Sequence, residues 1–155
     1  MNTIAVSEAF GSAPPRSAAV LCVKGENGRT DMMLTDWFTW LNIRRNPMIS
    51  FSLHRDAAAG ISLQEGDSFV LAFPPLNEAK RYAKTVSVKA DEAEENAARK
   101  PQTVPADGTP VRVPKGSEVL LVCTLAGAYN YPFKKVRIFN CNLEEARGGT
   151  GSMLD

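Results

Sequence analysis

Residues 34–56, "LTDWFTWLNIRRNPMISFSLHRD", contain the side-chain types that a site for a flat, anionic ligand needs. The stretch holds two tryptophans, two phenylalanines and the only histidine of the chain, and its basic residues form two pairs, Arg44 with Arg45 and His54 with Arg55. Aromatic rings can form an apolar wall, and a guanidinium binds a phosphate through two parallel hydrogen bonds. The pattern fits a binding pocket, but it equally fits an aromatic core segment that ends in charge.

The second half of this stretch, "MISFSL" at residues 48–53, predicts a half-buried strand, because apolar and small polar residues alternate. The predicted inward face consists of Ile49, Phe51 and Leu53. The opposite face consists of Met48, Ser50 and Ser52. A small polar face suits a strand that lines a site as well as one that faces solvent.

The flanking elements follow from apolar runs and turn signals. Residues 18–24 and the run after Gly28 predict a hairpin around "GENG", since Asn and Gly both tolerate positive φ. Residues 37–43 predict a strand that places four side chains on one face, Trp37, Thr39, Leu41 and Ile43.

Further along the chain, a short helix is expected at residues 57–64, capped by Asp56 and stopped by Gly66. "DSFVLAFPP" predicts a strand, and residues 76–86 predict a helix. Residues 118–143 predict two strands around a connection at 127–132.

The ends of the chain and one internal stretch lack such patterns. We expect one domain over residues 1–155, with a loose arm at 1–15 and a frayed tail at 144–155. Residues 87–116 are polar and rich in proline, which predicts a long surface excursion, partly helical at 91–100.

The composition excludes several classes of protein. The net charge of +1 gives no general electrostatic case for binding nucleic acid or an anionic membrane. No apolar run approaches the roughly 20 residues of a membrane span, and the N-terminus lacks the pattern of a secretory signal. The three cysteines have no metal-ligand spacing, and Cys22 and Cys123 lie in apolar runs, which predicts buried, inert thiols in a cytoplasmic protein.

Six or so strands, few short helices and no βαβ rhythm predict a mainly β fold, a small antiparallel barrel. The order of the signals resembles the flavin reductase-like family, which has the FMN-binding split-barrel fold with Greek-key connections. The resemblance is carried by "MMLTDWFTWLN", "RRNPMISFSLHRD", "AAAGISLQEGDSF", "VLAFP" and, more loosely, "VLLVCTL". It covers residues 18–73 well and 118–143 loosely.

Three departures from the family pattern matter, and in them several polar residues are replaced by apolar ones. An asparagine that the family often has before Thr35 is replaced here by Asp31 and Met32, the helix threonine near the phosphate aligns with Ala59, and an asparagine after the "geF" strand aligns with Ala72. Either fewer side chains hold the flavin, or flavin binding has weakened or been lost.

The resemblance implies a set of residues for FMN. Thr35 and the backbone of Asp36 and Trp37 would serve the ring edge, and Ser50 and Ser52 would flank the cofactor. His54 and Arg55 would meet the phosphate where the strand ends, although Asp56 opposes this charge. No catalytic side chain and no metal site are expected, because hydride transfer to a flavin needs no protein nucleophile.

The resemblance also implies a homodimer with the flavin at its two-fold interface. "YNYPFKK" at residues 129–135 is a candidate for the opposing wall of the site, or for core and turn packing. The expected function is an NAD(P)H:flavin reductase that passes reduced flavin to a partner oxygenase or another acceptor. The alternatives are an electron-transfer flavoprotein without NAD(P)H turnover and a split-barrel dimer that has lost its flavin.

Overall fold

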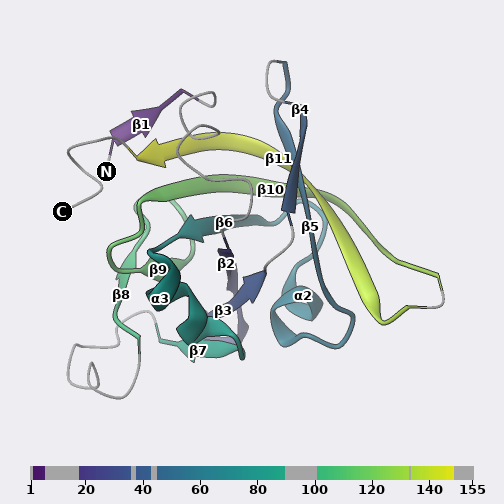
Figure 1. The fold of residues 1–155 in the computed structure, drawn as a ribbon, viewed down its shortest axis with the longest axis horizontal. Coiled ribbons are helices and arrows are strands. Elements are labelled where there is room, and N and C mark those ends of the chain that lie inside the picture. The colour runs from purple at the N-terminus through teal and green to yellow at the C-terminus, as the bar shows by residue number, and fades with distance from the viewer. Residues whose placement is uncertain are drawn as a thin grey trace.

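The computed structural model describes residues 2–5, 18–35, 38–42, 45–89, 101–132 and 134–148, and within them the fold is mainly antiparallel β, as expected (Figure 1). The strands are β1 (Asn2–Ile4), β2 (Ala19–Lys24), β3 (Thr30–Thr35), β4 (Phe38–Asn42), β5 (Met48–His54), β6 (Ser68–Phe73), β7 (Val86–Val88), β8 (Thr103–Pro105), β9 (Arg112–Pro114), β10 (Val119–Asn130) and β11 (Val136–Gly148). The helical elements are η1 (Glu26–Gly28), α2 (Ala58–Ser62), α3 (Leu76–Ala79) and η2 (Lys80–Tyr82). The described strands outnumber the six or so that the sequence predicts, because four of them are only three residues long.

One sheet contains nine of these strands and curls into a barrel. Its strands follow the order β4-β5-β11-β10-β6-β2-β3-β7, with β1 added beside β11, while β8 and β9 form a separate hairpin. Strands β3 and β5 stand near opposite ends of this order and are not paired in the sheet. The Thr35 hydroxyl nevertheless donates a hydrogen bond of 2.9 Å to the Ser52 carbonyl. The barrel is therefore open along the line where β3 faces β5, which we call the seam.

Two apolar cores lie on the two sides of the barrel wall. The inner core fills the barrel and includes Phe51 and Phe139, whose rings stack with their centroids 4.9 Å apart. The outer core contains Cys22, Met32 and Tyr82, and it is covered by α3, η2 and the β8–β9 hairpin. Because β2 and β6 lie between the two cores, their sequences are continuous apolar runs rather than alternating ones.

The predicted hairpin at the start of the domain is confirmed. β2 and β3 pair from Ala19 with Thr35 to Lys24 with Thr30, and Asn27 and Gly28 have φ values of 55° and 73° in the turn between them. The helix predicted at residues 76–86 is shorter than expected: α3 and η2 end at Tyr82, and Val86 already begins β7.

The excursion predicted at residues 87–116 is wrong for its described part. Residues 101–116 form the β8–β9 hairpin, which buries Ala106, Val111 and Val113 in the outer core. Apolar residues there are too few to form a recognisable pattern, but they reach the barrel because the hairpin folds back on it. The helix expected at 91–100 lies outside the described residues.

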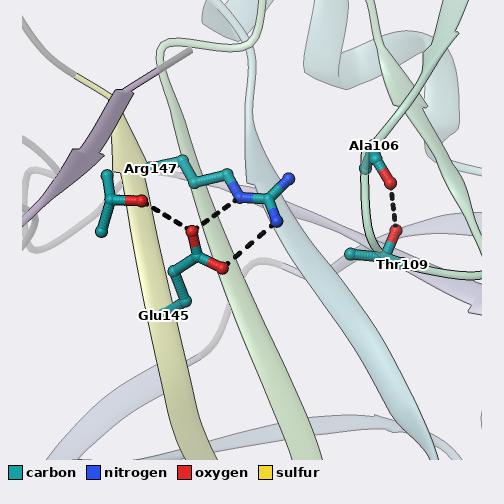
Figure 2. A network of polar contacts seen from close by, with 5 residues as sticks. Ala106, Thr109, Glu145 and Arg147 are labelled. Atoms are coloured by element: carbon teal, nitrogen blue, oxygen red, sulfur yellow. Dashed lines mark hydrogen bonds and ion pairs between the residues drawn. The ribbon is translucent and has the colours of Figure 1, made fainter.

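The loose N-terminal arm and the frayed tail are also wrong where the structure describes them. Residues 144–148 belong to β11, and Asn2–Ile4 pair with its end as β1. Side chains reinforce this pairing: Arg147 donates two hydrogen bonds to the carboxylate of Glu145, at 3.1 and 3.2 Å, and Thr3 donates a third at 2.7 Å (Figure 2). Residues 6–17 and 149–155 lie outside the described part of the chain.

Strands β10 and β11 run side by side and reach beyond the barrel as one long hairpin (Figure 1). The connection predicted at 127–132 is shorter than expected, because Gly127 lies within β10 at a register shift and the strand continues to Asn130. Tyr129 and Tyr131 are 51% and 52% exposed, so core packing of these tyrosines is wrong, whereas Tyr131 does lie in the turn of this hairpin. Phe133 lies outside the described residues.

The burial of the cysteines agrees with the prediction. Cys22, Cys123 and Cys141 are free and buried, and burial raises the pKa of all three thiols. Among the helices that the structure describes, none is long and apolar enough to cross a membrane.

Candidate functional site

The seam brings together two of the residues predicted to contact a cofactor. Thr35 ends β3, Ser52 lies in the middle of β5, and the hydrogen bond between the Thr35 hydroxyl and the Ser52 carbonyl joins the two strands. A threonine hydroxyl has one proton and two lone pairs. Because Thr35 gives its proton to Ser52, it has no second proton to donate, and at 2% exposure its role here is to join the two strands.

The polar side of β5 forms part of one continuous sheet face. Pairing between β5, β11 and β10 places Ser52, Ile138 and Tyr129 in one row across the three strands. Directly opposed residues of antiparallel strands lie on the same side of the sheet, so each row shares a face. The neighbouring rows on this face contain Ser50 with Asn140, and His54 with Val136.

The alternation predicted for β5 is confirmed, with one difference. Ile49, Phe51 and Leu53 are buried in the inner core. On the other side, Ser52 is half-buried and His54 is exposed, but Ser50 is only 4% exposed. Of the three polar residues predicted on this strand, Ser52 and His54 are therefore the more accessible to a ligand.

The end of β5 carries the predicted phosphate-binding residues on an exposed corner. His54 and Arg55 are both exposed, and Nδ1 of His54 accepts a 3.2 Å hydrogen bond from the backbone N–H of Asp56. The Asp56 carboxylate lies 3.9 Å from the same nitrogen, so a negative charge stands beside the predicted phosphate position, as the sequence suggests. The Arg55 backbone N–H donates to the carbonyl of Lys135, which fixes this corner against the β10–β11 hairpin.

The helix after this corner does not have the predicted cap. α2 spans only Ala58–Ser62, its N-cap is Ala57, and no side chain caps it, so the role assigned to Asp56 is wrong. The backbone N–H of Ala57 instead bonds to the carbonyl of His54 in a tight turn. A single helical turn offers few free N–H groups, so side chains must supply most of the charge for a phosphate here.

The aromatic residues of the opening stretch divide between the core and the undescribed part of the chain. Asp36, Trp37, Ile43 and Arg44 lie outside the described residues. Phe38 packs edge-to-face on Phe73 at 5.3 Å, and Trp40 packs on the inner core, so both are structural. The exposed face of β4 consists of Thr39 and Leu41.

Of the residues that depart from the family pattern, the three apolar ones are inaccessible, whereas Asp31 is half-buried. Ala59 is fully buried in the inner core, and Met32 and Ala72 are fully buried in the outer core. In this chain they cannot contact a ligand in the seam, and polar groups there would need buried partners.

A pocket that the sequence did not indicate lies where α2 approaches β3 and β7. It encloses about 330 Å³, and Arg29, Asp31 and Ser87 contribute to its lining. The Arg29 guanidinium donates to the Ser87 hydroxyl at 2.8 Å and to the Ser87 carbonyl at 2.9 Å. Arg29 follows a turn and belongs to no motif, so only the fold shows that its side chain lines a pocket.

A larger cavity of about 500 Å³ lies between the β8–β9 hairpin and the end of β11. Lys115, Glu145 and Arg147 are among its lining residues, and none of the residues predicted for the cofactor lines it. Within the described residues it is therefore distinct from the seam.

Comparison with known proteins identifies the fold. No model of a protein family matches the chain, and no curated protein matches it. Many solved structures do match. A protein with a split barrel domain from Shewanella frigidimarina NCIMB 400 has a TM-score of 0.69 at 10% identity, over 92% of this chain and 72% of that one.

Two further structures are similar over most of their length. The flavin reductase component of a bacterial two-component tryptophan halogenase has a TM-score of 0.66 at 21% identity, over 93% of this chain and 86% of that one. The NADH:FAD oxidoreductase of Streptomyces globisporus C-1027 has a TM-score of 0.66 at 16% identity, over 93% and 76%. The chain thus has the split-barrel fold, as its sequence predicts.

Proposed function

We propose that this protein is a flavin reductase-like oxidoreductase that binds the FMN portion of a flavin along the seam and passes electrons from NAD(P)H to an acceptor. The observation that carries the proposal is the seam itself. Thr35 and Ser52 join β3 and β5 there, and the seam continues into the basic corner at His54 and Arg55. Proteins with this fold include the flavin reductase and the NADH:FAD oxidoreductase named above.

The residues present fit the chemistry of FMN. An isoalloxazine ring needs hydrogen-bond partners along its edge, and we propose the end of β3 at Thr35 and the backbone of Asp36 and Trp37 for this edge. The ribityl chain needs hydroxyl partners, for which the half-buried Ser52 is the accessible candidate, while Ser50 is 4% exposed and would have to act from behind it. His54 lies four positions after Ser50, roughly 13 Å along the strand, so the phosphate would lie near His54 and Arg55. The Arg55 guanidinium there is exposed and can bind the phosphate directly.

A bound flavin would supply the redox chemistry, by accepting a hydride from the nicotinamide and passing electrons on. The protein binds and orients the ring, which explains why no nucleophile or metal cluster is needed. Reduced flavin would then serve a partner oxygenase or another acceptor in the cytoplasm. The halogenase system named above contains such a reductase component.

A homodimer would complete the site. The sheet face that carries Ser52 also exposes Leu41 and Tyr129, each 51% accessible, in addition to Tyr131. Exposed apolar and aromatic side chains grouped on one face favour burial against a partner. A second copy packed around a two-fold axis would cover this face and bring a second chain to the flavin.

The test is to add excess FMN to the purified protein, remove free flavin by desalting, and record the visible spectrum before and after adding NADH or NADPH. We expect retained flavin that NAD(P)H bleaches, and weaker retention in Arg55→Ala. Flavin that is released on desalting but is reduced by NAD(P)H in steady state also supports the reductase. The control is Arg45→Ala, since Arg45 is an exposed arginine beyond β4.

Other outcomes would contradict the proposal in different ways. Retained flavin that neither nicotinamide bleaches would indicate an electron-transfer flavoprotein. Neither retention nor turnover would leave a split barrel that has lost its flavin. If light scattering gives the molar mass of one chain while flavin is bound, the homodimer is excluded but the flavin site is not.

A further inference from the structure

The cavity of about 500 Å³ beside the β8–β9 hairpin has no part in the proposed flavin site. Its floor is the outer side of the sheet, where Leu120 of β10 pairs with Arg147 of β11. Its wall is the hairpin, which contributes Val104 and Val113. β11 passes the seam at Ile138 and reaches Arg147 roughly 30 Å further along the strand. The cavity and the seam are therefore separate places on the molecule.

The Arg147 side chain lines this cavity with hydrogen-bond donors to spare. A guanidinium has five N–H groups. Nε and Nη2 of Arg147 donate to the Glu145 carboxylate at 3.1 and 3.2 Å, and no other acceptor for this guanidinium is found among the described residues (Figure 2). The side chain is only 15% exposed. Donors buried to this degree are normally paired, so the remaining N–H groups of Arg147 point to a ligand or an ordered water in the cavity.

The guanidinium is fixed in position, and the charge of Glu145 is already compensated. Arg147 reaches from β11 to the turn of the hairpin, where its Nη2 lies 3.7 Å from the point that a Cβ on Gly108 would occupy. Glu145 accepts a third hydrogen bond, of 2.7 Å, from the Thr3 hydroxyl. A donor held from two sides loses little conformational freedom when it binds an acceptor.

The charges of the lining favour one negative charge on a ligand rather than two. Lys115 is exposed and adds a second cation to that of Arg147, while Asp107 and Glu145 are the carboxylates of the lining. Two carboxylates oppose a dianion such as a phosphate monoester. A single carboxylate is a good acceptor for the free edge of a guanidinium, because the hydrogen bonds are charge-assisted.

The rest of the lining is mainly apolar. Val113 and Leu120 are 3% and 5% exposed and belong to the outer core, whereas Val104 is 37% exposed. Apolar walls with a few convergent polar groups are the usual composition of a small-molecule site, and the volume of this cavity is within the range of such sites. An apolar body of one or two rings would cover these walls and leave a polar head at Arg147.

We propose that this cavity is a second binding site, for a small organic acid with one carboxylate and an apolar ring body. The carboxylate bonds to the Arg147 guanidinium near the Lys115 ammonium, and the rings pack on Val104, Val113 and Leu120. The site does not depend on the proposed flavin function, because none of the residues assigned to the flavin lines it. Flavin and organic acid would therefore bind at the same time.

The experiment is to titrate the full-length protein with 2-naphthoate by calorimetry, and with 2-naphthamide, which has nearly the same shape without the charge. We expect 2-naphthoate to bind about tenfold more tightly, as a charge-assisted hydrogen bond provides. Arg147→Lys keeps the charge but not the planar fork and should weaken 2-naphthoate roughly fivefold. Lys115→Ala should weaken it roughly threefold, since this lysine is exposed.

Val104→Trp tests the location. It fills the cavity from a position that is already 37% exposed, so it should weaken 2-naphthoate binding about tenfold or more without lowering the melting temperature. The matched control is Leu76→Trp, which adds the same ring to an exposed residue of α3 that lines neither described pocket. Leu76→Trp should keep the affinity of the natural protein.

Four results would overturn the second site. Unchanged affinity in Val104→Trp would place the acid elsewhere, and equal affinity for 2-naphthoate and 2-naphthamide would exclude a carboxylate as the recognised group. Loss of 2-naphthoate binding in the presence of excess FMN would place the acid in the seam and would support the flavin pocket instead. Binding of neither compound would leave the cavity to water, whereas the flavin function would stand or fall by its own test.

Discussion

The hydrogen bond across the seam offers the most direct test of how the barrel is closed. Thr35 is 2% exposed, and its hydroxyl donates to the Ser52 carbonyl at 2.9 Å between strands that share no ladder. Thr35→Val removes the hydroxyl and keeps the shape of the side chain. A net hydrogen bond contributes about 0.5–1.5 kcal/mol, and a carbonyl left without its donor costs about 1–3 kcal/mol more when it is buried.

Because Ser52 is half-buried, water can partly replace the lost donor, and we expect Thr35→Val to lower the free energy of unfolding by about 1–2 kcal/mol. The assay is urea denaturation, supported by thermal melting, where a chain of this size loses roughly 2–4 °C per kcal/mol. Thr35→Ser should recover part of the loss, since it restores the hydroxyl.

The matched control is Thr124→Val in β10, which is half-buried and whose backbone is paired with Asn142 on one side and Ser68 on the other. We expect this change to stay within about 0.5 kcal/mol of the natural protein. If Thr35→Val and Thr124→Val have the same stability, packing rather than the Thr35 hydroxyl closes the seam. Whether Thr35→Val still retains flavin after desalting tests the role of Thr35 in binding, independently of its effect on stability.

Three further changes test the rest of the fold. Gly60→Ala would place a methyl group 3.0 Å from Phe139 Cζ, so we expect the free energy of unfolding, measured in urea, to fall by about 1 kcal/mol. The control is Gly127→Ala, where the space is open and the loss should be less than about 0.5 kcal/mol. Equal losses would contradict the crowding at Gly60. The Tyr82 hydroxyl is buried without a hydrogen-bond partner among the described residues, so Tyr82→Phe should have the same melting temperature as the natural protein or a higher one. The exposed control Tyr131→Phe should leave the melting temperature unchanged. A clearly lower melting temperature for Tyr82→Phe would mean that a buried water binds the hydroxyl. Hydrogen bonds from Arg147 and Thr3 hold the pKa of Glu145 below its ordinary 4.5, so its stabilisation is present above that pH and is lost as the pH falls further. Glu145→Gln should therefore lower the melting temperature at neutral pH and reduce the acid-side decline, unlike Glu65→Gln; parallel curves for Glu145→Gln and the natural protein would refute the link.

The sequence by itself determined the elements whose physical signal is local. Alternation in "MISFSL" predicted which side of β5 is buried, because side chains of a strand point alternately to its two faces. The Asn27–Gly28 turn predicted the β2–β3 hairpin, because both residues have positive φ there. The continuous apolar runs of β2 and β6 predicted strands. They did not predict why these strands are apolar on both faces, which is that they lie between the inner and the outer core.

Other features depended on contacts that no local pattern encodes. The β8–β9 hairpin looked like a polar, proline-rich excursion, yet Val111 and Val113 reach the outer core because the chain folds back on the barrel. The cap expected at Asp56 is wrong because α2 begins only at Ala58, so Ala57 takes the N-cap position that the sequence assigns to Asp56. Pairing of β11 with β1 likewise ordered residues that look like a frayed tail.

The candidate site divides in the same way. The types of residue along β5 could be predicted from sequence, since hydroxyls and an imidazole follow one another on the strand and a guanidinium comes directly after it. Their neighbours could not, because Thr35 meets Ser52 only when the barrel closes, and Arg55 meets Lys135 only when β5 pairs with β11. Local sequence sets which face of a strand is polar, while long-range strand pairing decides which polar and charged groups share that face.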